Sequence, residues 1–265
     1  VRDDRSQGAP TVRQTDWFRA GPAAPDFRAV DVLPDLNRAV VDYIENQAAR
    51  ARPFFVYYAL PSPHTPIVVA PEWRGRSGLG DYADFVMQTD DAVGQVMAAL
   101  ERAGIAENTL IVFTSDNGCS AQPAGAEALQ RAGHYPSGPL RGFKADLWEG
   151  GHRVPFIARW PARAKAGVTS DRTLTLNDLL ATCADLVGFR LPDNAGEDSV
   201  SFLPTLLGQP QPDRSAVVHH SISGHFAIRD GRWKLLLAHG SGGWTSPTET
   251  QAIAAGLPAV QLYDL

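Results

Sequence analysis

The sequence lacks most of the features that mark specialised classes of protein. Its two cysteines, Cys119 and Cys183, are too few for a dense disulfide framework and do not have the spacing of a metal site. No apolar run approaches the ~18 residues that span a bilayer, and the longest, such as residues 54–60, have the length of strands. The net charge of −5 gives no sign of a nucleic-acid partner. A single disulfide between the two cysteines is not excluded, so the compartment stays open.

The chain has the size and composition of a globular protein. With 265 residues, of which 44% are hydrophobic and 20% charged, it can bury a large core, as one big domain or a large one plus a small one. Residues 1–10 contain neither an initiator Met nor a secretory signal, and the chain stops on Leu265 without a closing element. We therefore expect residues beyond both ends, although processing of a precursor would also give such an N-terminus. The Arg-rich, Lys-poor composition is consistent with a GC-rich bacterial genome.

Hydrophobic patterning predicts an α/β fold. Residues 53–60 and 109–114 are continuous apolar runs of strand length, which is the pattern of strands buried on both faces. Between them, residues 82–103 have the apolar spacing of a helix that ends before a glycine. This order of elements is a βαβ unit and predicts parallel neighbours with a right-handed crossover. We expect part of a mostly parallel sheet flanked by helices, with another helix at 36–48, whereas residues 1–30 have no clear period and are predicted to be loop.

The C-terminal part of the chain has a different pattern, with short strands in place of long elements. The remaining predicted elements are a strand at 154–160, a helix at 176–188 and short strands at 216–222, 225–230 and 232–238. The pair Asp230 and Gly231 between the last two strands is a strong hairpin signal. We predict that residues 1–192 form a partial α/β core and that residues 193–265 form a smaller, truncated antiparallel β subdomain.

Four polar residues lie in loops that follow or flank the predicted core strands. His64, Asp116 and Asn117 come directly after two of these strands, and Lys144 precedes a third. Each has an ordinary interpretation by itself, because Asp-Asn-Gly is common turn chemistry and an isolated His or Lys is commonly a surface residue. Together they offer oxygen ligands for a hard cation, an imidazole that could donate a proton and an ammonium that could neutralise an anionic ester. If the two strands are parallel, His64 and Asp116 emerge at the same edge of the sheet.

Four ordered blocks of sequence resemble the type I sulfatases of the alkaline phosphatase superfamily. They read PFFVYYALPSPHTP, TLIVFTSDNG, LRGFKADLWEGGHRVPFIARWP and, at the end, RDGRWKLL with QLYDL. The resemblance extends from about Leu33 to Leu265. It is specific because the blocks agree in order and separation, whereas SDNG alone would be weak.

The resemblance implies a role for each of the four polar residues. Asp116 and Asn117 match the pair that binds a calcium ion, or sometimes magnesium, in these enzymes. His64 matches a histidine that contacts the sulfate and is a candidate proton donor to the leaving group, and Lys144 matches a lysine that holds a sulfate oxygen. The turn at 149–151 matches a glycine-rich segment whose role is structural.

The sequence also departs from the pattern of this family. The enzymes use a formylglycine made from the cysteine of a Cys-x-Pro-x-Arg motif, but Cys119 is followed by SAQP and Cys183 by ADLV. The early Asp-Asp metal pair is absent, because Asp3 and Asp4 follow no buried strand, and so is a Gly-Lys-Trp-His segment. All three belong to the N-terminal half of the family. The chain therefore resembles roughly the C-terminal half of a sulfatase, and we expect it to be inactive alone.

The resemblance predicts that the full protein is a sulfuric ester hydrolase whose substrates are sulfated carbohydrates more than small aryl sulfates. It also implies a periplasmic or secreted location. Two alternatives stay open: a related phosphoester or phosphonate hydrolase of the same superfamily, and a non-catalytic binding or structural protein that retains half of a site. The nucleophile outside this chain would distinguish the sulfatase from the phosphoester or phosphonate hydrolase, because a cysteine favours the former and a threonine or serine the latter. The oligomeric state is not readable from the sequence.

Overall fold

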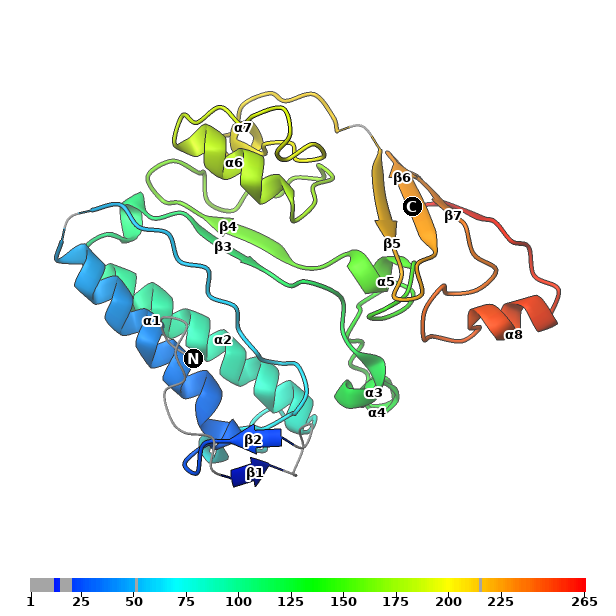
Figure 1. Cartoon of the computed structure of the whole chain (residues 1–265), viewed down its shortest axis with the longest axis horizontal. Coiled ribbons are helices and arrows are strands. Elements are labelled where there is room, and N and C mark those ends of the chain that lie inside the picture. Colours follow the sequence, from blue (N-terminus) through cyan, green and yellow to red (C-terminus); the bar gives the residue numbers. More distant parts are fainter. Residues whose placement is uncertain (1–11, 15–20, 51, 215) are drawn as a thin grey trace. The chain divides into compact units, whose positions relative to one another are not determined.

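The computed structural model describes residues 12–14, 21–50, 52–214 and 216–265 (Figure 1). The chain divides into two compact units. Unit 1 comprises residues 1–106 and 122–132, and unit 2 comprises residues 107–121 and 133–265. Asp3 and Asp4 lie outside the described residues. The predicted domain boundary after residue 192 stays a prediction.

Unit 1 is built on two long helices, α1 (Val32–Ala48) and α2 (Asp81–Arg102), which lie side by side. The buried side chains of Leu33, Val69, Phe85 and Ala92 form its core. Helix α2 ends where Gly104 adopts a φ of 69° and donates its N–H to Glu101 O at 3.0 Å, a conformation that glycine adopts without a Cβ clash. Both predicted helices are confirmed within a few residues at their ends.

The N-terminal region was expected to be loop. The structure instead has a short antiparallel ladder between β1 (Val12–Gln14) and β2 (Gly21–Ala23). Strands of three residues are too short to give a recognisable alternation, so the sequence pattern could not predict them. The short helices between residues 29 and 131 are η1 (Ala29–Asp31), η2 (Pro71–Trp73), η3 (Ala106–Asn108), α3 (Ala121–Ala124) and α4 (Ala126–Arg131).

The predicted strand at 53–60 forms no β-ladder with any described residue. Its side chains still alternate, because Phe54, Val56 and Tyr58 are partly buried while Phe55 and Tyr57 are 76% and 84% exposed. The segment therefore has the apolar sequence of a strand buried on both faces, but no described strand pairs with it. The expected parallel βαβ pairing does not occur among the described residues, whose ladders are all antiparallel.

Unit 2 begins with an antiparallel pair of strands, β3 (Ile111–Thr114) and β4 (Phe156–Arg159). Thr114 pairs with Phe156 at the end of β3 from which the Asp-Asn-Gly loop leaves. The helix predicted at 176–188 is confirmed as α6 (Asp178–Leu186), and the short helix α7 (Leu203–Leu206) follows it.

The C-terminal part of unit 2 is an antiparallel sheet, as predicted, but it has a fourth strand in addition to the three that the sequence pattern indicated. Its order is β5 (Val217–His220), β6 (Phe226–Asp230), β7 (Trp233–Leu236) and β8 (Gln261–Asp264), with α8 (Glu249–Ala254) between the last two strands. Asp230 pairs with Trp233, so Gly231 and Arg232 form a two-residue hairpin loop. Gly231 has a φ of 53°, which fits the type II′ preference for glycine at the first loop position.

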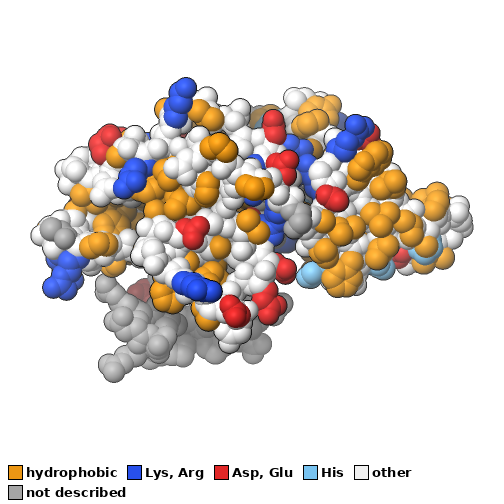
Figure 2. All heavy atoms as spheres, turned by 90° about the horizontal axis from the view of Figure 1, so that it is seen from above, with side chains coloured by type: hydrophobic (Ala, Val, Ile, Leu, Met, Phe, Trp, Pro, Cys, Tyr) orange, Lys and Arg blue, Asp and Glu red, His pale blue; other side chains and the backbone are white. Residues whose placement is uncertain are grey.

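The two faces of this sheet differ in burial. One face packs Ala227 and Leu236 against Leu147 and Trp148. The other face exposes an apolar row that crosses all four strands and consists of Val218, Ile228, Leu235 and Leu262. Figure 2 shows hydrophobic side chains gathered at the right, where Figure 1 places these strands. Among the described helices, none is both long and apolar enough to cross a membrane.

Candidate active site

The loop after β3 presents two neighbouring side chains with available oxygens. Asp116 is exposed, and its carboxylate has no hydrogen bond or ion pair with another described residue. Asn117 is half-buried and donates Nδ2–H to Gly118 O at 3.1 Å, so its Oδ1 is the end that can accept or coordinate. The Ser115 hydroxyl donates to Asn117 O at 3.0 Å and tightens the turn.

This loop is bonded directly to the segment that carries Lys144. Gly118 donates its N–H to Gly151 O at 3.0 Å, and Lys144 donates its backbone N–H to Cys119 O at 2.8 Å. A Cβ at Gly118 would overlap the carbonyl oxygen of Gly150, so the two backbones approach more closely than any other residue allows. The structure thus brings Asp116, Asn117 and Lys144 into two loops joined backbone to backbone.

The glycine-rich turn has the structural role that the resemblance implied. Residues 149–152 form the short helix α5 (Glu149–His152), and Gly150 donates its N–H to Arg141 O at 2.8 Å. A Cβ at Gly150 would overlap the carbonyl oxygen of Gly142.

Substitution of Gly150 by alanine should therefore destabilise the protein by about 2–3 kcal/mol, near the top of the usual range for point mutants. The matched control is Gly94→Ala, because Gly94 is exposed on α2 and a Cβ there would meet no atom within 4 Å. Gly94→Ala should stabilise the protein by about 0.5–1 kcal/mol. Urea unfolding of both variants measures the difference, and equal effects at the two positions would contradict the close approach.

Lys144 is half-buried, and its ammonium has no ion-pair partner among the described residues. It is available to bind an anion. His64 lies in unit 1, is exposed, and its Nδ1 is 2.8 Å from Thr65 O. If Nδ1–H donates to that carbonyl, Nε2 is the nitrogen left for a substrate. Because His64 and the other three residues belong to different units, the predicted common site of all four stays a prediction.

A buried ionic cluster behind the glycine-rich turn was missed from the sequence. Lys234 is 1% exposed and its Nζ is 2.8 Å from Glu149 Oε1, while an Arg229 nitrogen is 3.3 Å from Glu149 Oε2. These ion pairs tie α5 to β6 and β7. The one sign of it in the sequence was the alternation of β7, which places Lys234 on the same, inward face as Leu236.

Two histidines, His152 and His219, lie beside this cluster with their ring centroids 4.0 Å apart. Their Nε2 atoms are buried and have no hydrogen-bond partner among the described residues. Burial, followed by the neighbouring His219 and then by the positive charge of Lys234, lowers the pKa of His152 to about 3. Burial and the charge of Lys234 lower the pKa of His219 to about 4. Both rings are therefore held neutral in the folded protein.

Stability should fall steeply as the pH drops from about 6.5 towards 4. In this window the unfolded chain protonates both histidines and the folded chain does not, so the unfolded state binds more protons and the free energy of unfolding rises with pH. Each histidine contributes at most about 1.4 kcal/mol per pH unit. Urea unfolding at a series of pH values should show a shallower slope for His219→Gln and a still shallower one for the double variant with His152→Gln. Above pH 7 the effect of either substitution should not depend on pH, and unchanged slopes in the acid window would contradict the neutral buried pair.

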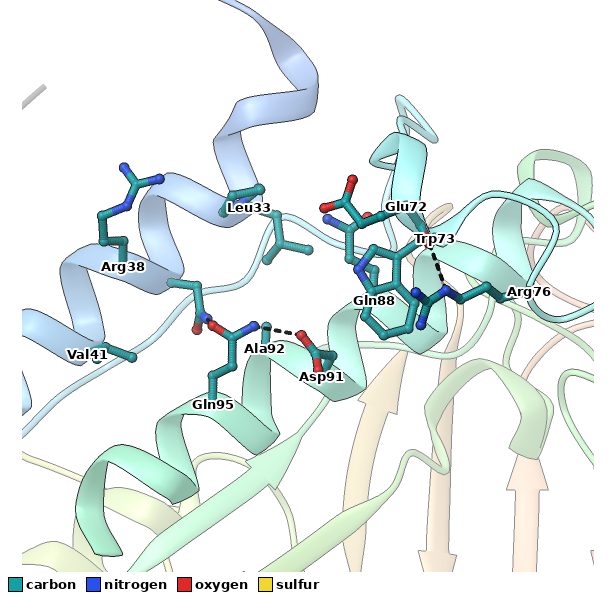
Figure 3. Close-up of a pocket in the computed structure, with 12 residues that line it drawn as sticks. Leu33, Arg38, Val41, Glu72, Trp73, Arg76, Gln88, Asp91, Ala92 and Gln95 are labelled. Atoms are coloured by element: carbon teal, nitrogen blue, oxygen red, sulfur yellow. Dashed lines mark hydrogen bonds between the residues drawn. The ribbon is translucent and has the colours of Figure 1, made fainter. Parts of the chain in front are cut away.

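A pocket of unit 1 contains none of the predicted site residues. Figure 3 shows this pocket, which has a volume of about 490 Å³ and lies between α1, α2 and η2. Three of its polar side chains pair with each other, because Asn37 donates to Gln95 at 2.8 Å and Gln95 donates to Asp91 at 2.6 Å. The predicted Asp116, Asn117 and Lys144 lie instead on the joined loops of unit 2.

The joined loops fit part of a hard-cation site. A carboxylate and an amide oxygen on adjacent residues are suitable ligands, but calcium takes about six to eight oxygens. Within the described residues, no three His, Cys, Asp or Glu side chains lie close enough together to hold a metal ion. Asp116 and Asn117 thus offer suitable oxygen ligands for a hard cation, but fewer than a calcium ion requires.

Comparison with known proteins gives the same family that the sequence resembles. The family model described as Sulfatase matches residues 7–189. The chain is 35% identical over 227 residues to the N-acetylgalactosamine-6-O-sulfatase of Bacteroides thetaiotaomicron. The aligned residues cover 85% of this chain and 44% of that protein. The chain thus spans less than half the length of this relative.

Solved structures give the same result for the fold. A structure described by its role in the metabolism of multiple glycosaminoglycans by Bacteroides thetaiotaomicron superposes with a TM-score of 0.81 at 31% identity, over 93% of this chain and 51% of that one. A crystal structure of Ps i-CgsB in complex with k-i-k-neocarrahexaose gives a TM-score of 0.65 at 29% identity, over 77% of this chain and 46% of that one. The α/β fold class is confirmed by these likenesses.

Proposed function

The chain belongs to the sulfatase family, and from this premise we propose that the protein of which it forms part hydrolyses sulfate esters of carbohydrates. The observation that carries the proposal is the pair of loops joined through their backbones: one carries the acid Asp116 and the amide Asn117, and the other carries Lys144, whose ammonium has no ion-pair partner among the described residues. A sulfate monoester is an anion that needs both a cationic contact and a balancing positive charge near its oxygens.

Each residue of the proposed site has one task. Lys144 binds a sulfate oxygen through its ammonium and stabilises the charge that develops when the sulfur–oxygen bond breaks. His64 donates a proton from its ring to the oxygen of the leaving sugar, which would otherwise depart as an alkoxide. Asp116 and Asn117 hold a divalent cation, for which we propose calcium or, in its place, magnesium.

The bound cation supplies positive charge that stabilises anionic oxygens in the site. The nucleophile is proposed to lie outside these residues, as a formylglycine, because neither cysteine of the chain has the Cys-x-Pro-x-Arg setting. The chain's own part in the reaction is therefore to hold the sulfate, to protonate the leaving group and to provide two of the cation's ligands.

The substrate class is proposed from the relatives. One is named as an N-acetylgalactosamine-6-O-sulfatase, and another was crystallised in complex with k-i-k-neocarrahexaose. We infer a sulfated glycan as the natural substrate. The test is to incubate the complete protein with a 6-sulfated N-acetylgalactosamine oligosaccharide, with nitrocatechol sulfate and with nitrophenyl phosphate. Release of sulfate from the sugar supports the proposal, whereas preferential release of phosphate would favour the related phosphoesterase.

A periplasmic or secreted location is proposed by analogy with the family, and a bacterial source from the Lys-poor composition. Fractionation of the producing cells tests the location, since activity confined to the cytoplasmic fraction would contradict it.

A further inference from the structure

We propose that Asp146 is a positioning residue that fixes Lys144 for its contact with the sulfate, an inference that rests on the proposed role of Lys144. Asp146 is fully buried, at 0% exposure. Its carboxylate accepts three backbone hydrogen bonds, from Phe143 at 2.9 Å, Trp244 at 3.0 Å and Thr245 at 3.1 Å. One of these donors immediately precedes Lys144, and the other two belong to the segment that follows β7.

The turn that contains Lys144 is strained and is held from outside. Ala145 has a φ of 84°, which a residue with a Cβ adopts only where its surroundings impose it. Its carbonyl oxygen accepts the N–H of Ile222 at 3.1 Å, from the connection between β5 and β6. Asp146 also donates its own N–H to Phe143 O at 3.1 Å and closes the turn. The conformation at Lys144 therefore depends on contacts made by the C-terminal sheet.

The carboxylate occupies a niche that fits no larger group. A Cβ at Gly142 would lie 2.9 Å from Asp146 Oδ2, and a Cβ at Gly243 would lie 2.6 Å from Oδ1. Glycine on both sides lets backbone N–H groups reach the two oxygens directly. The niche is built around a side chain that has acceptors only, and it links the Lys144 turn to the sheet.

An amide in place of this carboxylate would fail at one contact. In an Asp146→Asn variant, the side-chain orientation that keeps the amide oxygen beside Trp244 and Thr245 turns the NH₂ group towards the Phe143 N–H, and two donors then face each other. The loss falls on the hydrogen bond next to Lys144. The bond from the Lys144 N–H to Cys119 O is not changed by the substitution, so the Lys144 turn loses one of its contacts and keeps the other.

A double-mutant cycle in the complete enzyme tests whether Asp146 acts through Lys144. We expect Lys144→Ala to lower kcat/KM for a sulfate ester by about 10²–10³-fold and Asp146→Asn to lower it by about 10–100-fold, mostly in kcat, because the contact strengthens in the transition state. In the Lys144→Ala background, Asp146→Asn should cost less than about twofold. Hydrogen exchange of the peptide that spans residues 141–148 should be faster in Asp146→Asn than in the unsubstituted enzyme.

The matched control is Asp178→Asn. Asp178 is also buried, in the same unit, and accepts backbone N–H groups from Thr175 at 2.8 Å and Val200 at 2.9 Å. It additionally forms an ion pair with the buried Arg214, but it has no bond to the Lys144 segment. This variant should lose stability while the folded enzyme keeps its kcat/KM and the normal exchange rate at 141–148. If Asp146→Asn has the same fold-effect with and without Lys144, or if it changes only stability as Asp178→Asn does, Asp146 is structural and the inference is overturned. Lack of any sulfate-ester hydrolysis by the unsubstituted enzyme would instead overturn the proposed function, and this role of Asp146 with it.

Discussion

Replacement of Asp116 by alanine in the complete enzyme should reduce sulfate-ester hydrolysis by about 10³-fold or more, with almost no change in stability. The activity should fall because the cation loses a charged ligand, and a bound metal ion is worth several kcal/mol of transition-state stabilisation, at tenfold in rate for about 1.4 kcal/mol. The stability should not fall, because Asp116 is exposed and its carboxylate contacts no described residue through a hydrogen bond or ion pair. Exposed substitutions of this kind stay within about 0.5 kcal/mol.

The measurement combines initial rates, thermal unfolding and calorimetric titration with calcium. Asp116→Asn keeps an oxygen and loses the charge, so its rate should lie between those of the unsubstituted enzyme and Asp116→Ala. Asp90→Ala, which removes an exposed acid from α2, is the control and should leave the rate unchanged. An Asp116→Ala enzyme with normal activity and normal calcium affinity would remove this residue from the cation site.

Residues 1–265 expressed alone should not hydrolyse sulfate esters at a detectable rate. The reason is chemical, since a nucleophile is required for attack on sulfur and neither cysteine has the motif for conversion to formylglycine. The strand-like segment at 53–60 exposes Phe55 and Tyr57 and lacks sheet neighbours among the described residues.

The assay is incubation with nitrocatechol sulfate beside the complete protein at equal concentration. The complete protein should release chromophore, and residues 1–265 should give the rate of the buffer blank. Turnover by residues 1–265 that survives purification and disappears in Asp116→Ala would contradict the prediction. It would show that these residues contain a nucleophile of their own.

Local features were predicted well because their causes are local. The two long helices of unit 1 follow from apolar spacing, and the hairpin at Gly231 follows from a residue that tolerates positive φ beside two alternating strands. The proposed ligands Asp116 and Asn117 and the cation Lys144 were identified by residue type, position beside apolar runs and family resemblance. None of these predictions depended on how the strands pair with one another.

Pairing and burial were decided only by the tertiary structure. The sequence predicted a parallel neighbour for β3, but its partner is the antiparallel β4, because pairing depends on which segments meet in space and an apolar run does not specify that. Lys234 and Asp146 look like ordinary charged residues in the sequence, yet both are almost fully buried. Their partners come from other segments: Glu149 lies 85 positions from Lys234, and the amide of Trp244 lies 98 positions from Asp146. The sequence by itself therefore determined the family, the helices, the hairpin and the chemical character of the candidate site. The conformation of the turn that carries Lys144 depends instead on contacts between distant segments, which exist only once the chain has folded.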